Sequence, residues 1–217
     1  MRLAIFDLDN TLIAGDSDHG WGEFLVQKGC VDAEAFKSAN DRFYEQYKAG
    51  TLNIQEYLEF SLKPLTEQSP ENLVKLHNEF MHQVIEPMLL PKAEALLKQH
   101  RDQGDYLLII TATNGFVTRP IAQRLGVDDI ITTDPEIIDG VYTGKFIGIP
   151  SFQDGKVKRL AEWLADKKLT FDDAYFYSDS INDLPLLEQV PNPVAVDADA
   201  RLTQIATDRN WLQMSLR

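Results

Sequence analysis

Cysteine is almost absent from this chain, in which Cys30 is the only one among 217 residues. A single thiol excludes an intrachain disulfide framework and fits a reducing compartment, so we expect a cytoplasmic protein. Cys30 follows Gly29 and has no basic neighbour in the sequence except Lys28. We therefore expect a packed thiol without a catalytic role.

Basic residues and long hydrophobic runs are also scarce. The chain has 21 Lys and Arg against 34 Asp and Glu, a formal net charge of -13, whereas general nucleic-acid binding requires a basic surface. No apolar run approaches the roughly 20 residues that span a membrane. We therefore expect no nucleic acid, no membrane segment and no signal peptide. The length allows one domain, or a core with a smaller insert.

What the chain does have is a run of acidic and polar residues directly after an N-terminal apolar segment. Residues 3–6, LAIF, are typical of a strand buried on both faces, and residues 7–12, DLDNTL, follow it. Asp7 and Asp9 would leave this strand on the same side. There, one carboxylate could attack as a nucleophile while the other moves a proton. A strand-to-turn junction also favours Asp for local reasons, so this segment alone leaves both interpretations open.

A second apolar segment, residues 106–111, predicts another buried strand that ends in Thr111. The loop 112–115, ATNG, then leads into a helical pattern. A hydroxyl and free backbone N–H groups before a helix N-terminus suit a phosphate oxygen. Taken alone, the loop is explained more simply by helix capping through Thr113 or Asn114.

Two later segments place charged residues at comparable positions. Lys156 opens an amphipathic helix, where the helix dipole disfavours a cation, which suggests that this lysine serves something outside its own helix. The apolar segment 174–177 predicts a strand that delivers Asp179 at its end, and Asn182 and Asp183 follow. Asn182 or Asp183 could merely cap the next helix. Asp179 lies where ligands bind in open parallel sheets.

Together these segments resemble the haloacid dehalogenase-like phosphohydrolases, whose four motifs occur here in order across nearly the whole chain. Motif one is residues 7–11, motif two is Thr111, motif three is Lys156 and motif four is residues 179–183. The chain is most similar to the phosphoserine phosphatase branch. The signs are the Asn-Asp pair in motif four and the segment 137–145, which predicts a β-hairpin through Asp-Gly. Some members of the bacterial subgroup that it resembles most are described as histidinol-phosphatases.

Strand and helix patterns alternate from residue 87 onward, which predicts a parallel α/β sheet. Residues 16–86 show several helical patterns and no convincing strand, where a doubly wound fold normally needs one helix. We therefore expect a Rossmann-like parallel sheet core made of residues 1–14 and 87–217. A helical cap made of residues 15–86 would be inserted after motif one. The resemblance implies the same cap, closing over the active site.

The resemblance also implies hydrolysis of a small phosphate monoester through an aspartyl-phosphate intermediate. Asp7 would be the nucleophile, and Asp9 would protonate the leaving group and then activate water. Mg²⁺ would be held by the Asp7 carboxylate, the Asp9 backbone carbonyl and Asp179, with Asp183 acting from behind these ligands. The phosphoryl oxygens would be held by Thr111, Ala112, Lys156 and Asn182.

The substrate is expected to be a small phosphorylated metabolite, specifically an amino alcohol. In phosphoserine phosphatases an acidic residue after motif one receives the substrate amine, and a cap arginine receives its carboxylate. Asp16 falls at the first position. An alignment by eye puts Ser61 at the second, where it cannot replace an arginine fork. Histidinol phosphate meets this description and phosphoserine does not. His19 and Trp21, where the cap begins, are further candidates for substrate contact.

Four alternatives stay open at this point. Phosphoserine phosphatase is one, and a phosphotransferase or phosphomutase on the same fold is another. A non-catalytic metabolite-binding protein would have no need for both Asp7 and Asp9. A glycosyltransferase that uses Asp-x-Asp to hold a metal-nucleotide would leave Thr111, Lys156 and Asp179 unexplained. The sequence does not define an oligomeric state.

Overall fold

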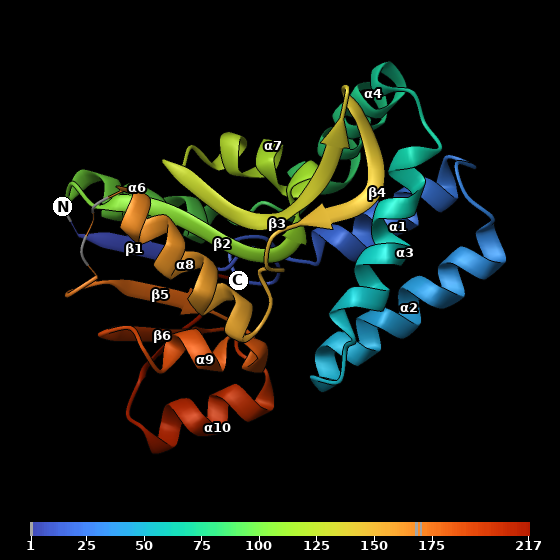
Figure 1. The fold of residues 1–217 in the computed structure, drawn as a ribbon. Coiled ribbons are helices and arrows are strands. Elements are labelled where there is room, and N and C mark those ends of the chain that lie inside the picture. Colours follow the sequence, from blue (N-terminus) through green and yellow to red (C-terminus); the bar gives the residue numbers. More distant parts are fainter. Residues whose placement is uncertain (1, 168, 170) are drawn as a thin grey trace.

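The computed structural model describes residues 2–167, 169 and 171–217, and a seven-stranded sheet forms its centre (Figure 1). The strand order is β4-β3-β2-β1-β5-β6-β7, and all neighbouring pairs are parallel except β3 and β4. This confirms the predicted α/β fold. The strands are β1 (Leu3–Phe6), β2 (Tyr106–Asn114), β3 (Asp129–Ile138), β4 (Val141–Ile147), β5 (Tyr175–Ser178), β6 (Asn192–Val196) and β7 (Leu212–Met214).

Helices cover both faces of the sheet and fill the segment between β1 and β2. None in the described part of the chain is both long and apolar enough to cross a bilayer. They are α1 (Ser17–Gln27), α2 (Ala33–Ala49), α3 (Ile54–Thr66), α4 (Pro70–Phe80), the π-helix η1 (Met81–Ile85), α5 (Glu86–Met88), α6 (Pro91–Asp102), α7 (Gly115–Leu125), α8 (Asp154–Lys167), the 3₁₀-helix η2 (Ile181–Asp183), α9 (Leu184–Leu187) and α10 (Ala200–Asp208).

Side-chain alternation along the strands creates two hydrophobic cores, one on each face of the sheet. Within β1, Ala4 and Phe6 belong to one core, and Leu3 and Ile5 belong to the other. The first core includes side chains of α6 and α7 and continues into the helices between β1 and β2. The second includes side chains of α8, α9 and α10. Because both faces are covered, the central strands have nearly continuous apolar sequences.

Four helices, α1 to α4, occupy the segment predicted to hold the cap, and they gather beside one end of the sheet (Figure 1). A polar side chain caps the N-terminus of each, which satisfies backbone N–H groups of the first turn. These caps are Asp16, Asp32, Asn53 and Ser69. The predicted domain boundaries, 1–14 with 87–217 and 15–86, stay a prediction.

The β-hairpin predicted for residues 137–145 is present, formed by antiparallel β3 and β4. Asp139 and Gly140 at its tip have φ angles of 51° and 81°, as the tight turn of a two-residue hairpin requires. Strand β4 packs against α3, so the hairpin reaches the helical segment (Figure 1). Strand β7 is not predicted by the sequence. It has three residues, and its exposed Leu212 and Gln213 give no alternating pattern.

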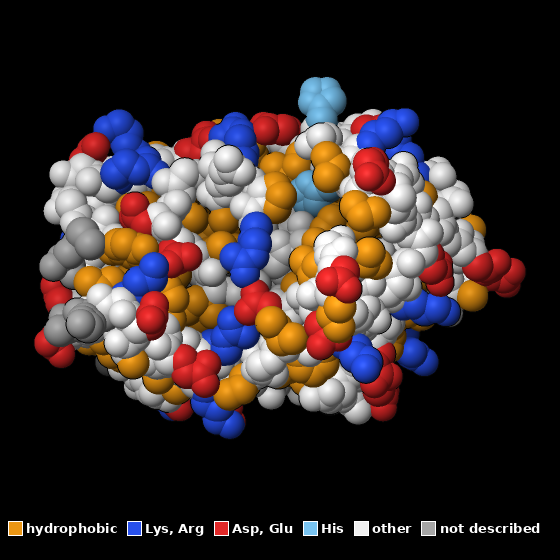
Figure 2. Space-filling model, turned by 45° about the horizontal axis from the view of Figure 1, so that its top comes forward, with side chains coloured by type: hydrophobic (Ala, Val, Ile, Leu, Met, Phe, Trp, Pro, Cys, Tyr) orange, Lys and Arg blue, Asp and Glu red, His pale blue; other side chains and the backbone are white. Residues whose placement is uncertain are grey.

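The surface carries charges of both signs, which Figure 2 shows mixed over one face of the molecule. Large hydrophobic side chains reach the surface at a few positions in the described residues, and several of these lie on the β3–β4 hairpin. They are Ile137, Ile138, Val141 and Ile147.

The position of β1 determines where a site can form. It lies between β2 and β5, so the chain leaves β1 toward one side of the sheet and later returns on the other. Such a switch of direction opens a crevice at the carboxyl ends of the strands, where α/β proteins bind ligands. Asp7 follows β1, Thr111 lies in the last part of β2, and Asp179 follows β5.

Candidate active site

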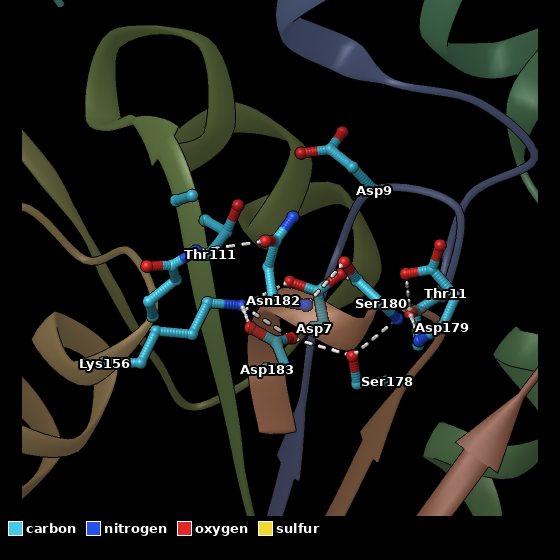
Figure 3. Close-up of polar contacts among 12 residues, drawn as sticks. Asp7, Asp9, Thr11, Thr111, Lys156, Ser178, Asp179, Ser180, Asn182 and Asp183 are labelled. Atoms are coloured by element: carbon cyan, nitrogen blue, oxygen red, sulfur yellow. Dashed lines mark hydrogen bonds and ion pairs between the residues drawn. The ribbon is translucent and has the colours of Figure 1, made fainter. Parts of the chain in front are cut away.

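The centre of the crevice is a buried lysine between two carboxylates (Figure 3). The Lys156 Nζ atom lies 2.8 Å from Asp7 Oδ1 and 2.7 Å from Asp183 Oδ1. All three side chains are buried. Lys156 lies in the first turn of α8, and both of its partners, Asp7 and Asp183, lie outside that helix, as its unfavourable position there suggested. Burial alone would lower the pKa of Lys156, but the charges of Asp183 and Asp7 raise it above its ordinary value.

Asp179 lies on the other side of Asp7 and is connected to it through Thr11. The Thr11 hydroxyl is 3.1 Å from Asp179 Oδ1 and 3.4 Å from Asp7 Oδ2. It also accepts a hydrogen bond of 3.0 Å from the Asp179 backbone N–H. Threonine at this position of motif one therefore fixes the distance between the ends of β1 and β5.

Asp183 is held from two sides, by Lys156 and by the Ser178 hydroxyl at the end of β5, which donates at 2.7 Å. Ser178 in turn accepts from the Ser180 backbone N–H at 3.1 Å. This positions Asp183 behind Asp7 rather than beside the opening of the crevice. Ser178 could not be recognised as a support from the sequence, because serine is common where strands end in turns.

Negative charge exceeds positive charge among these groups. Lys156 pairs with Asp7 and Asp183, whereas Asp179 has no lysine or arginine partner among the described residues. Burial raises the pKa of Asp7 to about 7 against the lowering effect of Lys156, and Asp183 and Asp9 raise it further. Burial, together with the charges of Asp7 and Asp183, raises the pKa of Asp179 well above its ordinary value. A divalent cation against Asp7 and Asp179 would relieve this imbalance, so the donor set fits a hard metal ion.

Asp9 lies apart from this network and has its own supports. Its Oδ1 accepts from the Ser17 backbone N–H at 2.6 Å, and its Oδ2 accepts from the Thr113 hydroxyl at 2.9 Å. Burial, and then the nearby charge of Asp16, raise the pKa of Asp9 to about 6, while the Ser17 and Thr113 bonds lower it. A carboxyl group with this pKa can both give and take a proton near neutral pH.

Residues 112–114 were predicted as a loop, but they continue strand β2 to Asn114, and α7 begins at Gly115. The two candidate capping residues, Thr113 and Asn114, have different partners. Asn114 caps α7, because its side-chain oxygen accepts from the Phe116 and Val117 N–H groups. Thr113 instead bonds Asp9, a role that its place in the sequence did not indicate. The Thr111 hydroxyl accepts from the Thr113 N–H at 3.1 Å.

Asn182 lies where motif four predicts it, but it contacts a helix of the predicted cap. Its side-chain N–H donates to the Tyr47 carbonyl at the end of α2, at 2.9 Å. Its side-chain oxygen accepts from Gln153 at 3.2 Å. Arg201 of α10 donates to the next two carbonyls of α2, those of Lys48 and Ala49. The C-terminal end of α2 is thus tied to the sheet half of the molecule.

A pocket opens from Asp7 and Asp9 toward the helices of the predicted cap. Its acidic groups are Asp7, Asp9, Asp16 and Asp18, and Thr111 and Ala112 lie on the sheet side. Among the described residues, no lysine or arginine lines it. The other lining residues are mostly aromatic or apolar: His19, Asn40, Phe43, Tyr44, Tyr47, Leu52, Ile54, Tyr57 and Thr113.

The remaining candidates divide clearly. Asp16 and His19 line the pocket, and the His19 ring lies 4.7 Å from the ring of Tyr44. Trp21 is buried among aromatic rings such as Phe80 and is not a lining residue. Ser61 does not line the pocket either, whereas Tyr57, one helical turn earlier on α3, does. Neither position holds an arginine.

Comparison with known proteins agrees with this geometry. A model of the haloacid dehalogenase-like hydrolase family matches residues 4–188. A protein named histidinol-phosphatase from Neisseria meningitidis serogroup C is 46% identical over 214 residues, which cover 97% of this chain and 96% of that protein. Phosphoserine phosphatase SerB1 of Mycobacterium tuberculosis is 30% identical over 211 residues, covering 96% of this chain and 68% of that protein.

Solved structures show the same fold. A protein of unknown function from Bordetella pertussis Tohama I superposes with a TM-score of 0.94 at 44% identity, covering 100% of this chain and 99% of that one. A substrate-bound phosphoserine phosphatase superposes with a TM-score of 0.73 at 16% identity, covering 100% and 93%. The chain belongs to the haloacid dehalogenase-like hydrolase family, and it is a phosphatase of that family, a phosphoric monoester hydrolase.

Proposed function

We propose that this phosphatase hydrolyses a small amino-alcohol phosphate through an aspartyl-phosphate intermediate, with Mg²⁺ as its cofactor and histidinol phosphate as its substrate. The observation that supports the substrate is the pocket beside Asp7, which is lined by carboxylates and lacks lysine and arginine among the described residues. The name of the relative at 46% identity over nearly its whole length points the same way. A cytoplasmic location fits the single cysteine.

The reaction would proceed in two steps. An Asp7 carboxylate oxygen forms a bond to phosphorus while the bond from phosphorus to the ester oxygen breaks, and Asp9 gives its proton to the departing alkoxide. A water molecule then attacks the phosphorus of the aspartyl phosphate, Asp9 takes a proton from this water, and the bond from phosphorus to the Asp7 oxygen breaks. Inorganic phosphate leaves, and both carboxylates return to their starting state.

The environment of Asp9 supports its role in both steps. Its two side-chain oxygens face Ser17 and Thr113 rather than Lys156, so no lysine or arginine in the described part of the chain holds it in the ionised form. Its pKa of about 6 makes both protonation states accessible near neutral pH. Asp7 contacts Lys156, which favours its ionised form, but burial together with Asp183 and Asp9 still raises its pKa to about 7. A metal ion on Asp7 would therefore be needed to keep it in the ionised form that attacks phosphorus.

Phosphatases of this family typically use a divalent metal ion. Here Asp7 and Asp179, with the Asp9 backbone carbonyl, would hold it, and Asp183 would act through Lys156 from behind. Bound there, Mg²⁺ would neutralise part of the negative charge on the transferring phosphoryl group. Thr111, Ala112 and Lys156 would hold the phosphoryl oxygens. We keep Asn182 in this set, since its contact with Tyr47 uses only one of its two side-chain N–H donors.

Asp16 would receive the amine of the substrate. It lines the pocket as the cap of α1, and its Oδ1 accepts from the His19 N–H at 2.8 Å. A substrate carboxylate there would face carboxylates and, among the described residues, no lysine or arginine, so it would lose its hydration without gaining an ion-pair partner of that kind. We therefore expect discrimination against phosphoserine by more than ~10²-fold in kcat/KM.

The test is release of inorganic phosphate from 4-nitrophenyl phosphate, histidinol phosphate and phosphoserine, each with Mg²⁺, with EDTA, and with EDTA followed by excess Mg²⁺. We expect activity on all three to need the metal, and histidinol phosphate to be the best of the three. Full activity with EDTA would disprove the metal. A higher kcat/KM for phosphoserine, the activity named for the 30% identical relative, would disprove the substrate while leaving the phosphatase assignment intact.

A further inference from the structure

Asp18 is a buried carboxylate of the pocket for which the proposed reaction has no use. It lies in the first turn of α1, two residues after Asp16, and it is 7% exposed. Its neighbours come from both halves of the molecule. The Asn114 side chain donates to its Oδ1 at 3.4 Å, and the Tyr57 hydroxyl of α3 lies near enough to lower its pKa.

These neighbours do not require a charged residue at position 18. Asn114 already caps α7 through its own side-chain oxygen, and its contact with Asp18 is long. A neutral side-chain oxygen, such as that of asparagine, would accept from Asn114 and Tyr57 equally well. A buried carboxylate costs more than a buried amide, because it loses more hydration. Its presence in a pocket without lysine or arginine points to a positive charge brought by the ligand.

The wall facing these carboxylates is aromatic. Phe43, Tyr44 and Tyr47 of α2 and Tyr57 of α3 line the same pocket. Aromatic faces attract cations, and they pack well against planar rings. Acidic and aromatic groups together therefore select a ligand with basic nitrogen groups, one of which can be part of a flat ring.

We propose that Asp18 is a specificity-determining residue that receives a second basic nitrogen group of the substrate, while Asp16 receives the first. This rests on the proposed function and narrows it. The substrate class becomes phosphate monoesters with two basic nitrogen groups and no acidic group besides the phosphate. An ammonium with an imidazole, as in histidinol phosphate, satisfies it. A phosphate ester with a single ammonium does not.

The experiment compares three esters that differ only in these groups. Histidinol phosphate has both, 2-aminopropyl phosphate has only the ammonium, and 3-(imidazol-4-yl)propyl phosphate has only the ring. For the unchanged enzyme we expect kcat/KM for histidinol phosphate to exceed that of either single-group ester by at least about tenfold. Asp16→Asn and Asp18→Asn should each remove most of the advantage from a different group. The effect should be mainly in KM, since neither residue touches the reacting phosphorus.

Tyr57→Phe is the matched control, because it removes the hydroxyl near Asp18 but keeps the carboxylate and the ring. It should preserve the ratio between the esters, whatever it does to the absolute rates. Equal losses on all three esters in Asp18→Asn, with folding confirmed by thermal unfolding, would show a structural role and overturn the inference. The inference would also be overturned if Asp16→Asn and Asp18→Asn both removed the rate advantage of the same nitrogen group. If the unchanged enzyme prefers neither nitrogen group, the proposed substrate itself has failed.

Discussion

Two buried polar networks in this molecule use the same kinds of side chain with opposite results. One lies between α6 and the sheet. There the Asp105 carboxylate accepts from Arg2 Nε at 2.9 Å and lies 2.7 Å from His100 Nδ1, and the other ring nitrogen of His100 lies 2.8 Å from the Tyr177 hydroxyl. Burial alone would raise the pKa of Asp105, but the bonds from Arg2 and His100 bring it below its ordinary value.

The other network is the active site, where Asp7 and Asp183 share Lys156 and Asp179 adds a third carboxylate beside Asp7. Burial and like charges raise the pKa of Asp7 and of Asp179 there. In the first network each acceptor has its own donors, so the group stabilises the fold. In the second the donors are too few for the acceptors, so the group stores unfavourable charge that a metal ion and a phosphoryl group can relieve. The balance of partners, rather than burial, separates the structural network from the catalytic one.

The largest effect is expected for Asp7→Asn, which should lower kcat by at least ~10³-fold, since an amide cannot form the aspartyl phosphate. The fold should not suffer. Without metal, removing one of the carboxylates that share Lys156 relieves repulsion, so the thermal midpoint should stay the same or rise. Phosphate release measures the change in kcat, and thermal unfolding in EDTA measures the change in the thermal midpoint.

Two outcomes would contradict the contrast between the catalytic network of Asp7 and the structural network of Asp105. Substantial turnover by Asp7→Asn would mean that another group attacks phosphorus. A clear fall in the midpoint would mean that Asp7 stabilises the fold as Asp105 does. Trapping the unchanged enzyme with beryllofluoride should place the adduct on Asp7 alone.

Asp9→Asn should have the next largest effect, and one that depends on the leaving group. Alkyl phosphates, whose alkoxides need a proton, should lose ~10²–10⁴-fold in kcat. 4-Nitrophenyl phosphate should lose much less in the phosphorylation step. Thr113→Val, which removes a bond to Asp9 but leaves its carboxyl group, should show the same pattern more weakly. Equal losses on alkyl and aryl esters would argue that Asp9 is not the general acid.

The sequence predicted the parts of the site that follow from strand ends. Asp7, Thr111 and Asp179 stand at the carboxyl ends of three apolar segments, and parallel strands bring such ends to one edge. Lys156 was predicted by its motif and by its unfavourable place at a helix start. The structure brings its Nζ within 2.8 Å of Asp7, although 149 residues separate the two in the chain.

Contacts between elements without a local pattern were beyond the sequence. Asp18 has the same residue type as Asp16 and lies two residues after it, and only the fold brings Tyr57 of α3 close to it. The support of Asp9 by Thr113 depends on how β2 meets the loop after β1. The network of Asp105 could not be predicted from the sequence either, because its residues come from distant segments and each of these residue types is common on protein surfaces.

Asp105→Asn tests the structural network. We expect it to lower the free energy of unfolding by ~2–4 kcal/mol, because it removes the buried charge that accepts from Arg2 and faces the buried His100 ring. The kcat should be unchanged. The pKa of Asp105 is lowered in the fold, so its contribution is present above its ordinary pKa of 3.8 and is lost as pH falls below it. The variant should therefore lose less stability than the unchanged protein between pH ~5 and pH ~2.

Asp173→Asn is the control for that experiment. Asp173 also faces Arg2, at 3.8 Å, but its side chain is 70% exposed. An exposed pair of this kind contributes less than ~1 kcal/mol. If both variants lose the same free energy of unfolding, the burial of Asp105 and its contacts with both Arg2 and His100 do not explain its contribution to stability. The comparison between the two networks would then fail.

The smallest effect on activity is expected for a substitution at the C-terminal end of α2, where Asn182 and Arg201 contact this helix. Arg201 donates to the Lys48 and Ala49 carbonyls, and Asn182 donates to the Tyr47 carbonyl beside them. A guanidinium at a helix C-terminus is favoured by the helix dipole, but Arg201 is exposed, so the contact is worth ~1 kcal/mol or less. Arg201→Ala should therefore raise KM about two- to fivefold by loosening α2 over the pocket, with little change in kcat on the same substrate.

Arg209→Ala is the matched control for Arg201, since Arg209 follows the same helix α10 and pairs with Glu188, away from α2. It should leave KM unchanged. An equal change in both variants would point to a general effect on α10. No change in either would mean that Asn182 alone holds the end of α2, and that the catalytic network needs no help from the surface to keep the pocket closed. A KM change confined to Arg201→Ala would show that the two halves are joined by directed bonds to helix carbonyls. The acidic site would then lie beneath helix α2, and Arg201, which is outside the site, would hold the end of that helix by hydrogen bonds.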